Sequence, residues 1–527
     1  MKSIFIKKNI LILSLLIYFL IGSIYSINTG LSHDEFHEQR NWEYNVELFN
    51  NFFYSTPLSE SFLNYPDKYY GIGFQIISQP IQFLLSNFIK NFQNVDSTTA
   101  HLLGKHFVSF CFFLISGFFV YLILSKIVKN NFFLYTATSI YLLYPYLLGH
   151  SFFNPKDIPF LTIWLICTYL STNVFSKLSS SSHLYYKQIF LISLFTALLL
   201  SIRISGILIF IQYLFTFIIY LNSEKIKYSY FLKKNFIKFV FFLLSTLILT
   251  YLFYPVFWNN PLAIFDAINF MSNHFNNVCT LTLGKCIFSK NLEPTYIPIW
   301  LLVKLPAIIL FGILLLPFTE KNIFLNNENK IIFGTILLSS MLIPLILIFR
   351  KVHLYDELRQ IIFLIPLLFI TGITSLFYFS KRFFYFVTFI TIIIFLIENI
   401  KIYPYQYIWF NTPSRILNLS KNFELDYWGI SGKELSKQVV KINKNVNKKP
   451  CVLSIWTTSF FLKNKKYSCI DSWSNIDKDY PRPFFAAQNV RNLKKSKPFK
   501  CETIYESKFK LLFTNEEFIT GRLLKCI

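Results

Sequence analysis

Long runs of apolar residues recur along the first four hundred residues of the chain, and short polar loops separate them. Several of these runs reach the roughly 20 apolar residues that an α-helix needs to span a bilayer. About 11 spans are expected, near residues 10–27, 102–126, 132–150, 158–175, 187–202, 204–221, 236–255, 298–317, 331–349, 360–378 and 383–398. The pattern predicts an all-α polytopic membrane protein, because a membrane β-barrel shows short segments of alternating hydrophobicity instead.

Basic residues in the loops predict the orientation of these spans, because cytoplasmic loops carry an excess of Lys and Arg. With the N-terminus inside, the basic residues of the inner loops are Lys126, Lys129, Lys177, Lys187, Lys225, Lys227, Lys233, Lys234, Lys238, Lys321, Lys330, Lys381 and Arg382. The outer loops are then 28–101, 151–157, the turn near Arg203, 256–297 and 350–359, and everything after residue 399 also lies outside. The acidic residues of the N-terminal half concentrate in the first outer loop, which agrees with this orientation.

Composition and charge fit the same class. Of the 527 residues, 54% are hydrophobic and 20% aromatic, and the mean hydropathy is +0.46. A net charge of +24 would suit a nucleic-acid-binding protein, but the lysines cluster in short loops between spans. The charge therefore indicates orientation and attraction to anionic lipid, and the expected partner is a membrane rather than a nucleic acid. The first span follows Lys2, Lys7 and Lys8, yet it is long and lacks a small-residue cleavage site, so a retained anchor is expected.

Two further segments complete the organisation. Residues 71–90 are apolar but carry Gln75, Gln79 and Gln82 at helical spacing, which predicts an amphipathic helix in the membrane interface. After residue 399 the apolar runs shorten and Lys, Asn and Ser become frequent. We therefore expect two domains, a membrane domain over 1–399 and a small α/β soluble domain over 400–527. The runs 451–456 and 509–513 are expected strands of the second domain.

Six cysteines lie in segments that are expected outside the membrane. Cys451, Cys469, Cys501 and Cys526 belong to the soluble tail, and Cys279 and Cys286 to the outer loop before it. An oxidising compartment would allow two disulfides in the tail and a third in the loop. Free thiols remain the alternative, and the sequence does not determine the pairing in the tail.

The most polar stretch beside a predicted span runs from Gly30 to Glu38 in the first outer loop. Its adjacent carboxylates, Asp34 and Glu35, lie at a membrane boundary, where charged groups are costly and tend to be functional. A carboxylate in a concave site can act as a general base on a hydroxyl. An ordinary acidic loop is the alternative. His33 and His37 with Asp34 spell His-Asp-x-x-His, close to the zinc-protease pattern, and a looser divalent-metal site is a further interpretation.

Three cations lie at the ends of predicted apolar helices, all on the expected outer side of the membrane. Lys156 follows Asn154-Pro155 and precedes Asp157. Arg203 and Arg359 likewise lie where a predicted apolar helix begins or ends. These charges also have ordinary explanations. A carboxylate such as Asp157 is favourable at a helix N-terminus, and long cationic side chains extend toward the membrane interface. Three cations that converge on one face would, however, form an anion site.

At this point the chain resembles a known family, the membrane-embedded glycosyltransferases of the GT-C fold. The likeness is to glycosyltransferase family 39, which includes protein O-mannosyltransferases and lipid A aminoarabinose transferases. The residues that carry it are Asp34-Glu35, Asn154-Pro155-Lys156-Asp157, Arg203, Tyr355-Asp356 with Arg359 before Phe363-Leu364-Ile365-Pro366, Tyr403 to Asn411, and Glu424 to Gly429. This resemblance implies a polyprenyl-phosphate sugar as donor and a lipid or protein acceptor outside a bacterial-type inner membrane.

The resemblance also implies roles for single residues. Asp34 would be the general base of an inverting transfer, and Glu35 would orient the acceptor or bind a metal. Lys156, Arg203 and Arg359 would bind the donor phosphate. The expected substrate-binding residues are Asn154, Asp157, Tyr355 and Asp356, and the expected ligands of a divalent metal are His33 and His37. A transporter or flippase of lipid-linked saccharides is the alternative from another class, and repeated halves with charges inside helices would favour it.

Overall fold

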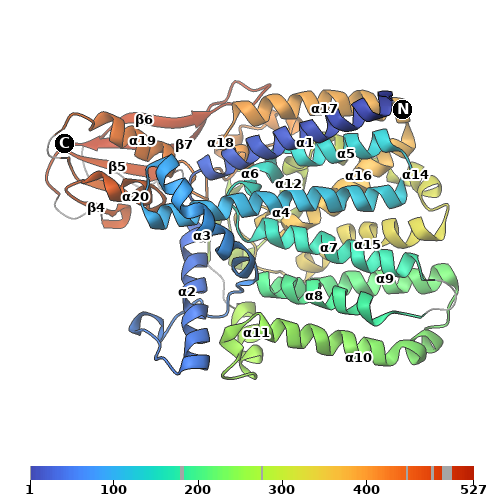
Figure 1. The fold of residues 1–527 in the computed structure, drawn as a ribbon. Helices are drawn as coiled ribbons and strands as arrows, with labels where there is room; N and C mark the ends of the chain where they lie inside the picture. The colour runs from blue at the N-terminus through green and yellow to red at the C-terminus, as the bar shows by residue number, and fades with distance from the viewer. Residues whose placement is uncertain (1, 179–182, 274–276, 447–448, 476–479, 490–500) are drawn as a thin grey trace.

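The structure is a computed structural model that describes residues 2–178, 183–273, 277–446, 449–475, 480–489 and 501–527. A bundle of long helices carries a small sheet domain at one end (Figure 1). The helices of the bundle are α1 (Lys2–Asn28), α4 (Ser97–Ile127), α5 (Asn131–Leu143), α6 (Pro145–Ser151), α7 (Asp157–Ser176), α8 (Tyr186–Ile202), α9 (Ile209–Glu224), α10 (Tyr228–Leu252), α12 (Tyr296–Lys304), α13 (Ala307–Leu314), α14 (Leu316–Ile323), α15 (Asn327–Phe349), α16 (Ile365–Phe379) and α17 (Lys381–Lys401). The expected fold class, a polytopic helical membrane protein with a small sheet-containing C-terminal domain, is confirmed.

Fewer helices than the sequence pattern predicts have the length and composition expected of a span. Within the described residues, seven helices are long and apolar enough to cross a membrane, or up to nine if each of two bent pairs is one span. The expected count of 11 is therefore not confirmed. The run 187–202 becomes α8, which has 17 residues, and the run 298–317 bends by 116° between α12 and α13. Pro306 lies at this bend, where its ring removes a backbone donor and stops the helix.

The chain turns sharply where the first span ends. Helix α2 (His33–Tyr54) makes an angle of 87° with α1, so it lies across the end of the bundle (Figure 1). Glu35 stabilises this corner, because its Oε1 accepts a hydrogen bond from the backbone N–H of Ser32, the N-cap of α2, at 2.6 Å. The turn places the first residues of α2 at the end of the bundle rather than in an extended loop.

Helix α3 (Gly73–Gln93) confirms that the glutamine-bearing segment is helical. Gln75 and Gln82 are buried, while Phe83 and Leu84 on another face are about three-quarters exposed, at 75% and 76%. This division of polar and apolar faces matches the expected amphipathic pattern. The helix is not among the candidate spans, and its position in a membrane interface stays a prediction.

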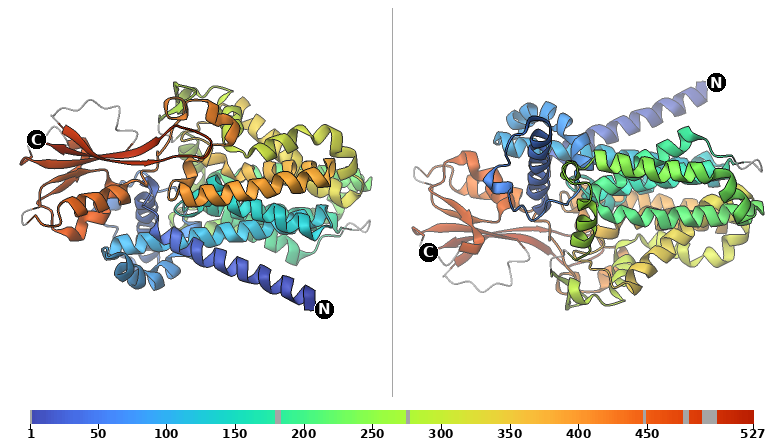
Figure 2. Two further views of the ribbon diagram at one scale, coloured as in Figure 1. Left: turned by 90° about the horizontal axis from the view of Figure 1, so that it is seen from above. Right: turned by 90° about the horizontal axis from the view of Figure 1, so that it is seen from below.

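The sheet domain lies at the same end of the bundle as α2, as both views in Figure 2 show. Its strands are β3 (Val452–Ser454), β4 (Ile470–Ser472), β5 (Phe484–Asn489), β6 (Cys501–Phe509) and β7 (Phe518–Cys526), in the order β4-β3-β5-β7-β6. Strand β3 is parallel to β4 and β5, and β7 is antiparallel to β5 and β6. Helices α19 (Gly432–Ile442) and α20 (Trp456–Leu462) pack beside the sheet.

The predicted strands of this domain are partly right, and the two disulfides that its four cysteines allow are both present. The run 451–456 contains β3, but β6 ends at Phe509, and the rest of the run 509–513 is not strand and ends in a turn at Leu512 and Phe513, where φ is 56° at Phe513. Bonds join Cys451 to Cys469 and Cys501 to Cys526. Each bond joins adjacent strands or the residues that flank them, so it closes an edge of a small sheet that has a limited core.

Candidate active site

A cleft of about 590 Å³ lies at the end of the bundle beside α2. The beginning of α2, the segment 66–71, the start of α7, the end of α8 and the segment 352–363 form its walls. Its charged residues are Asp34, Glu38, Asp67, Lys156, Asp157, Arg203 and Arg359. The cleft therefore collects acidic and basic groups from positions far apart in the sequence, where the sequence analysis expected the substrates to bind.

Asp34 lies in the first turn of α2, and its Oδ2 accepts a hydrogen bond from Nη1 of Arg359 at 2.8 Å. About a third of its side chain, 35%, is exposed to the cleft. Burial disfavours the charged carboxylate, but the positive charges of Arg359 and Lys156 outweigh this effect and lower the pKa of Asp34. Asp34 is thus an ionised, accessible carboxylate at the positive end of a helix, as a general base requires.

The three cations that the sequence singled out line this one cleft, and each pairs with a carboxylate. Nζ of Lys156 lies 2.7 Å from Oε1 of Glu38, and Arg203 pairs with Asp157. Arg359 contacts Asp34 and also lies 3.6 Å from Asp356. An anionic ligand would therefore have to displace these carboxylates before it could pair with the cations.

Glu38 is a residue of the cleft to which the sequence analysis assigned no role. Besides Lys156, its carboxylate accepts a hydrogen bond from Nε2 of Gln75 in α3 at 2.6 Å. The pKa of Lys156 is raised, because the charge of Glu38 outweighs the opposing effect of burial. Helical spacing could have identified this residue, since Glu38 follows Asp34 by four positions and so lies on the same face of α2.

Glu35 points away from the cleft, which corrects its expected contact with the acceptor. Its side chain is fully buried, and its Oε2 lies 2.9 Å from Nε2 of His106 in α4. Nδ1 of His106 is 3.0 Å from the carbonyl oxygen of Ser26, which can only accept, so Nδ1 carries a proton. Adjacent residues of a helix face about 100° apart, which explains why Asp34 meets the cleft and Glu35 the corner between α1 and α2.

The two histidines do not share a site. His33 contacts the sheet domain, where its Nε2 lies 3.4 Å from Nδ2 of Asn489 and its ring meets that of Trp456. His37 lines the cleft, with a side chain that is 64% exposed and 4.0 Å from Asp67. The described part of the chain holds no group of three or more His, Cys, Asp or Glu that fits a metal ion. The residues therefore do not fit the expected metal site or the zinc-protease pattern.

Asn154 and Asp157 shape the turn before α7. Asn154 is buried, its Oδ1 accepts from the backbone N–H of Asp157 at 2.9 Å, and its Nδ2 donates to Oδ2 of Asp157 at 2.9 Å. Asn154 therefore organises the backbone of this turn and does not line the cleft, and its expected contact with substrate stays a prediction. Asp157 is 3% exposed, lines the cleft and holds Arg203.

Tyr355 and Asp356 flank Arg359 from two sides. The ring centre of Tyr355 lies 4.9 Å from the guanidinium, and Trp428 of the segment after α17 covers it at 4.6 Å. Tyr355 lines the cleft, whereas Asp356 is buried behind the arginine. The expected contacts of Tyr355 and Asp356 with substrate stay predictions, and Asp356 contacts Arg359 rather than the cleft.

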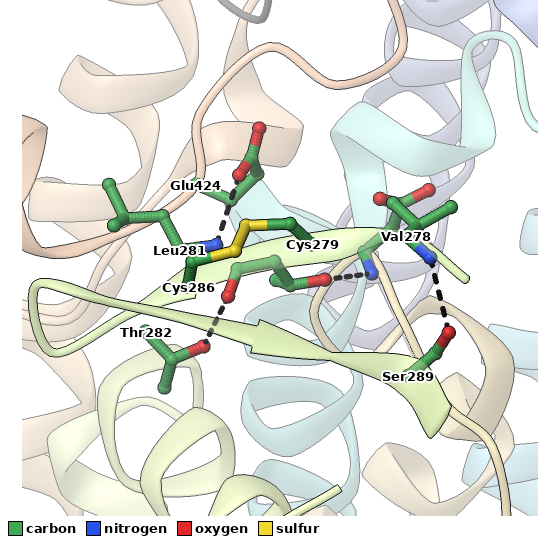
Figure 3. The surroundings of a disulfide bond; sticks show 9 residues. Val278, Cys279, Leu281, Thr282, Cys286, Ser289 and Glu424 are labelled. Carbon is green, nitrogen blue, oxygen red and sulfur yellow. Dashed lines mark hydrogen bonds between the residues drawn. A yellow bond between two sulfur atoms is a disulfide. The ribbon is translucent and has the colours of Figure 1, made fainter. Parts of the chain in front are cut away.

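A disulfide-closed hairpin supports this segment (Figure 3). Strands β1 (Cys279–Thr282) and β2 (Lys285–Phe288) are joined by the bond between Cys279 and Cys286. Oγ1 of Thr280 accepts from the backbone N–H of Asp356 at 2.9 Å. Asp356 and Glu357 have positive φ angles of 58° and 65°, which such residues adopt only when their surroundings impose them. The hairpin thus holds the strained turn that presents Arg359.

Loss of this bond should loosen the turn. Replacing Cys279 and Cys286 by Ser removes a loop constraint that contributes about 2–3 kcal/mol. We expect faster amide hydrogen exchange over residues 353–359 and a lower unfolding midpoint. The control is Cys111→Ser, which removes a free thiol. Unchanged exchange over the turn would show that the hairpin does not support it.

Comparison with known proteins supports the fold. No protein-family model and no curated protein matches the chain. The crystal structure of ArnT from Cupriavidus metallidurans in the apo state is 10% identical, with 100% of this chain and 99% of that chain covered and a TM-score of 0.50. The same protein bound to undecaprenyl phosphate is also 10% identical, with 98% of each chain covered and a TM-score of 0.48. The chain therefore shares the fold of ArnT, the GT-C fold that the sequence resemblance implied.

Proposed function

We propose that this protein transfers a sugar from a polyprenyl-phosphate donor to a hydroxyl group of a lipid or protein acceptor. One observation carries the proposal. Asp34 and Arg359, which are 325 residues apart, meet at 2.8 Å in a cleft that also contains Lys156 and Arg203. A carboxylate base beside a set of cations is what the transfer of a sugar from a phosphate requires.

In the proposed reaction, Asp34 takes the proton of the acceptor hydroxyl while the hydroxyl oxygen forms a bond to the anomeric carbon. The bond from that carbon to the phosphate oxygen breaks, and its electron pair leaves with polyprenyl phosphate. This single displacement inverts the anomeric carbon and passes through an oxocarbenium-like state. Arg359, Lys156 and Arg203 stabilise the phosphate as its charge grows.

The apolar wall of the cleft suits the polyprenyl chain. Ile202 at the end of α8 and Ile204 and Leu208 in the short 3-10 helix between α8 and α9 flank Arg203, and Ile207 beside them is 56% exposed. The donor phosphate would lie against the cations while its chain follows this wall into the bilayer. We place the cleft and the sheet domain on the outer side of a bacterial-type inner membrane, following the distribution of basic loops.

The test is sugar transfer by the purified protein from a panel of radiolabelled polyprenyl-phosphate sugars to a membrane extract. We expect the wild type to label an acceptor and Asp34→Asn to lose this labelling. The labelled product then identifies the acceptor. If label crosses liposome membranes equally with both proteins and no acceptor is labelled, the protein is a carrier and the enzyme proposal fails.

The transfer rate should remain constant well into the acid range. Since Arg359 and Lys156 lower the pKa of Asp34, the charged form persists as the pH falls and is lost only below the ordinary carboxyl value near 4. A donor phosphate that pairs with Arg359 and Lys156 would reduce the extent to which these cations lower the pKa of Asp34. We expect the acid limb of kcat, measured with saturating donor, at a higher pH than that of kcat/KM for the donor. If the acid limbs of kcat and kcat/KM coincide, the donor phosphate does not replace Asp34 as the partner of Arg359.

A further inference from the structure

A second cavity, of about 250 Å³, lies between α7, α8, α9 and α10. On α7 and α8 it lies toward the other end from the cleft, and on α9 it extends from Phe210 to Phe217. The cleft uses the beginning of α7 and the end of α8, whereas the cavity is lined by Val174 and Phe175 near the end of α7 and by Leu184 and Ile189 at the start of α8. The two sites share no lining residue, although Phe210 at the start of α9 follows Leu208 of the cleft by only two positions.

The walls of this cavity are almost entirely apolar. Phe210, Phe217, Phe239 and Phe242 contribute aromatic rings from α9 and α10. Lys238 is the one charged side chain among the described residues that line it. A cavity of this kind suits a hydrocarbon chain with a single anionic end.

Lys238 is an unusual cation for such a place, because its side chain is only 6% exposed. Its Nζ lies 3.0 Å from Nδ1 of His183 and about as close to the other ring nitrogen, at 3.1 Å. No carboxylate in the described ranges pairs with it. A cation buried beside lipid is costly unless an anion compensates it, so this lysine indicates a functional site.

The surroundings favour an anion from the bilayer. Residues on the outer faces of α10, such as Phe236 and Leu243, are 65% and 57% exposed, as expected of a helix at the rim of a bundle in lipid. The loops and helix ends on this side are rich in lysine and include Lys177, Lys187, Lys225, Lys227, Lys233 and Lys234. Basic pockets between membrane helices on the lysine-rich side bind the head groups of anionic lipids.

We infer that this cavity binds an anionic glycerophospholipid of the leaflet next to the lysine-rich loops. One acyl chain occupies the apolar space, and the phosphate accepts hydrogen bonds from Lys238 and His183. The lipid supplies the missing counter-charge and joins α10 to α7, α8 and α9. This inference is independent of the proposed sugar transfer.

Native mass spectrometry of the purified protein with phosphatidylglycerol and phosphatidylcholine tests it. We expect the wild type to retain one phosphatidylglycerol in preference to phosphatidylcholine, and to gain thermal stability with the first lipid only. Lys238→Gln should weaken retention of phosphatidylglycerol about five- to tenfold. Lys187→Gln is the matched control, because Lys187 is an exposed lysine at the same end that does not line the cavity.

A second variant separates the lipid site from a folding defect. Ile192→Phe fills the cavity and keeps Lys238, and it should also reduce retention of phosphatidylglycerol. Equal retention by the wild type, Lys238→Gln and Ile192→Phe would overturn the inference. Equal retention of phosphatidylcholine would overturn the requirement for an anionic head group. If undecaprenyl phosphate displaces phosphatidylglycerol at a lower concentration than phosphatidylglycerol itself, the cavity takes a prenyl chain and the assigned occupant is wrong.

Discussion

Asp34→Asn is expected to lower the rate of sugar transfer about 10²–10⁴-fold, the usual contribution of a positioned general base. Asparagine keeps the shape of the side chain but cannot take the proton of the acceptor hydroxyl. About a third of the Asp34 side chain is open to the cleft, so the residue can reach an acceptor without rearrangement of the backbone.

The same variant should bind polyprenyl phosphate more tightly than the wild type. Asp34 occupies Nη1 of Arg359 at 2.8 Å, and a phosphate must displace this carboxylate to reach the guanidinium. The neutral amide of asparagine competes far less for a cation, since hydrogen bonds between charged partners are about twice as strong as neutral ones. We expect about a tenfold lower Kd, equivalent to about 1.4 kcal/mol.

Turnover and affinity are measured on the same preparations, by transfer of labelled sugar and by binding of undecaprenyl phosphate. Glu43→Gln is the control, because Glu43 is an exposed carboxylate farther along α2 that does not line the cleft. Normal turnover in Asp34→Asn would remove this residue as the base. Weaker binding of the phosphate in that variant would show that Asp34 supports the anion site rather than competes with it.

Asp426→Ala is expected to destabilise the protein by about 3–5 kcal/mol, the cost of leaving several buried hydrogen-bond donors without their acceptor. Asp426 is fully buried between the bundle and the sheet domain. Its carboxylate accepts hydrogen bonds from Tyr407 Oη, from the backbone N–H groups of Gly429, Ile430 and Ser431, and from Ser431 Oγ. Alanine would leave all five donors without this partner.

The effect should reach the cleft, because this loop contacts both sides of the site. The carbonyl oxygen of Trp428 accepts from the backbone N–H of His33 at 3.0 Å, next to Asp34, and its ring covers Arg359. Gly429 has a φ of 73°, and a Cβ there would lie 2.8 Å from Nε2 of His33, so the turn is closely packed against α2. A loosened loop should therefore reduce transfer as well as stability.

Denaturant or thermal unfolding in detergent measures the loss of stability. Asp426→Asn retains one acceptor oxygen and should fall between alanine and the wild type. Glu517→Ala is the control, because this carboxylate of the sheet domain is 57% exposed and its ion pair with Lys508 lies in solvent. If Asp426→Ala and Glu517→Ala unfold at the same midpoint, the network does not hold the two domains together.

Much of the architecture follows from the sequence because it depends on local patterns. Apolar runs, the glutamine spacing of α3 and the change in composition near the end of α17 predicted the membrane class, an amphipathic helix and a soluble tail. The three disulfides connect the six cysteines expected outside the membrane. The span count was not confirmed because the run 132–150 is divided between α5 and α6, α8 is short, and two further expected spans bend by 87° and 116° at corners that hydropathy does not report.

The chemistry of the site was decided by the tertiary structure. The sequence identified Asp34, Lys156, Arg203 and Arg359 as charges near the ends of apolar helices. Which of them pair depends on contacts between segments that are distant in the sequence. Glu35 turns inward because His106 of α4 lies behind α2.

Glu38 joins the cleft because Lys156 and Gln75 meet it there. Local sequence patterns therefore identify which charges lie near the ends of the apolar helices. Which carboxylate faces the cleft and which cation it meets depends on contacts between distant segments, because the energy of a buried charge depends on the opposite charges that the fold brings within a few ångströms.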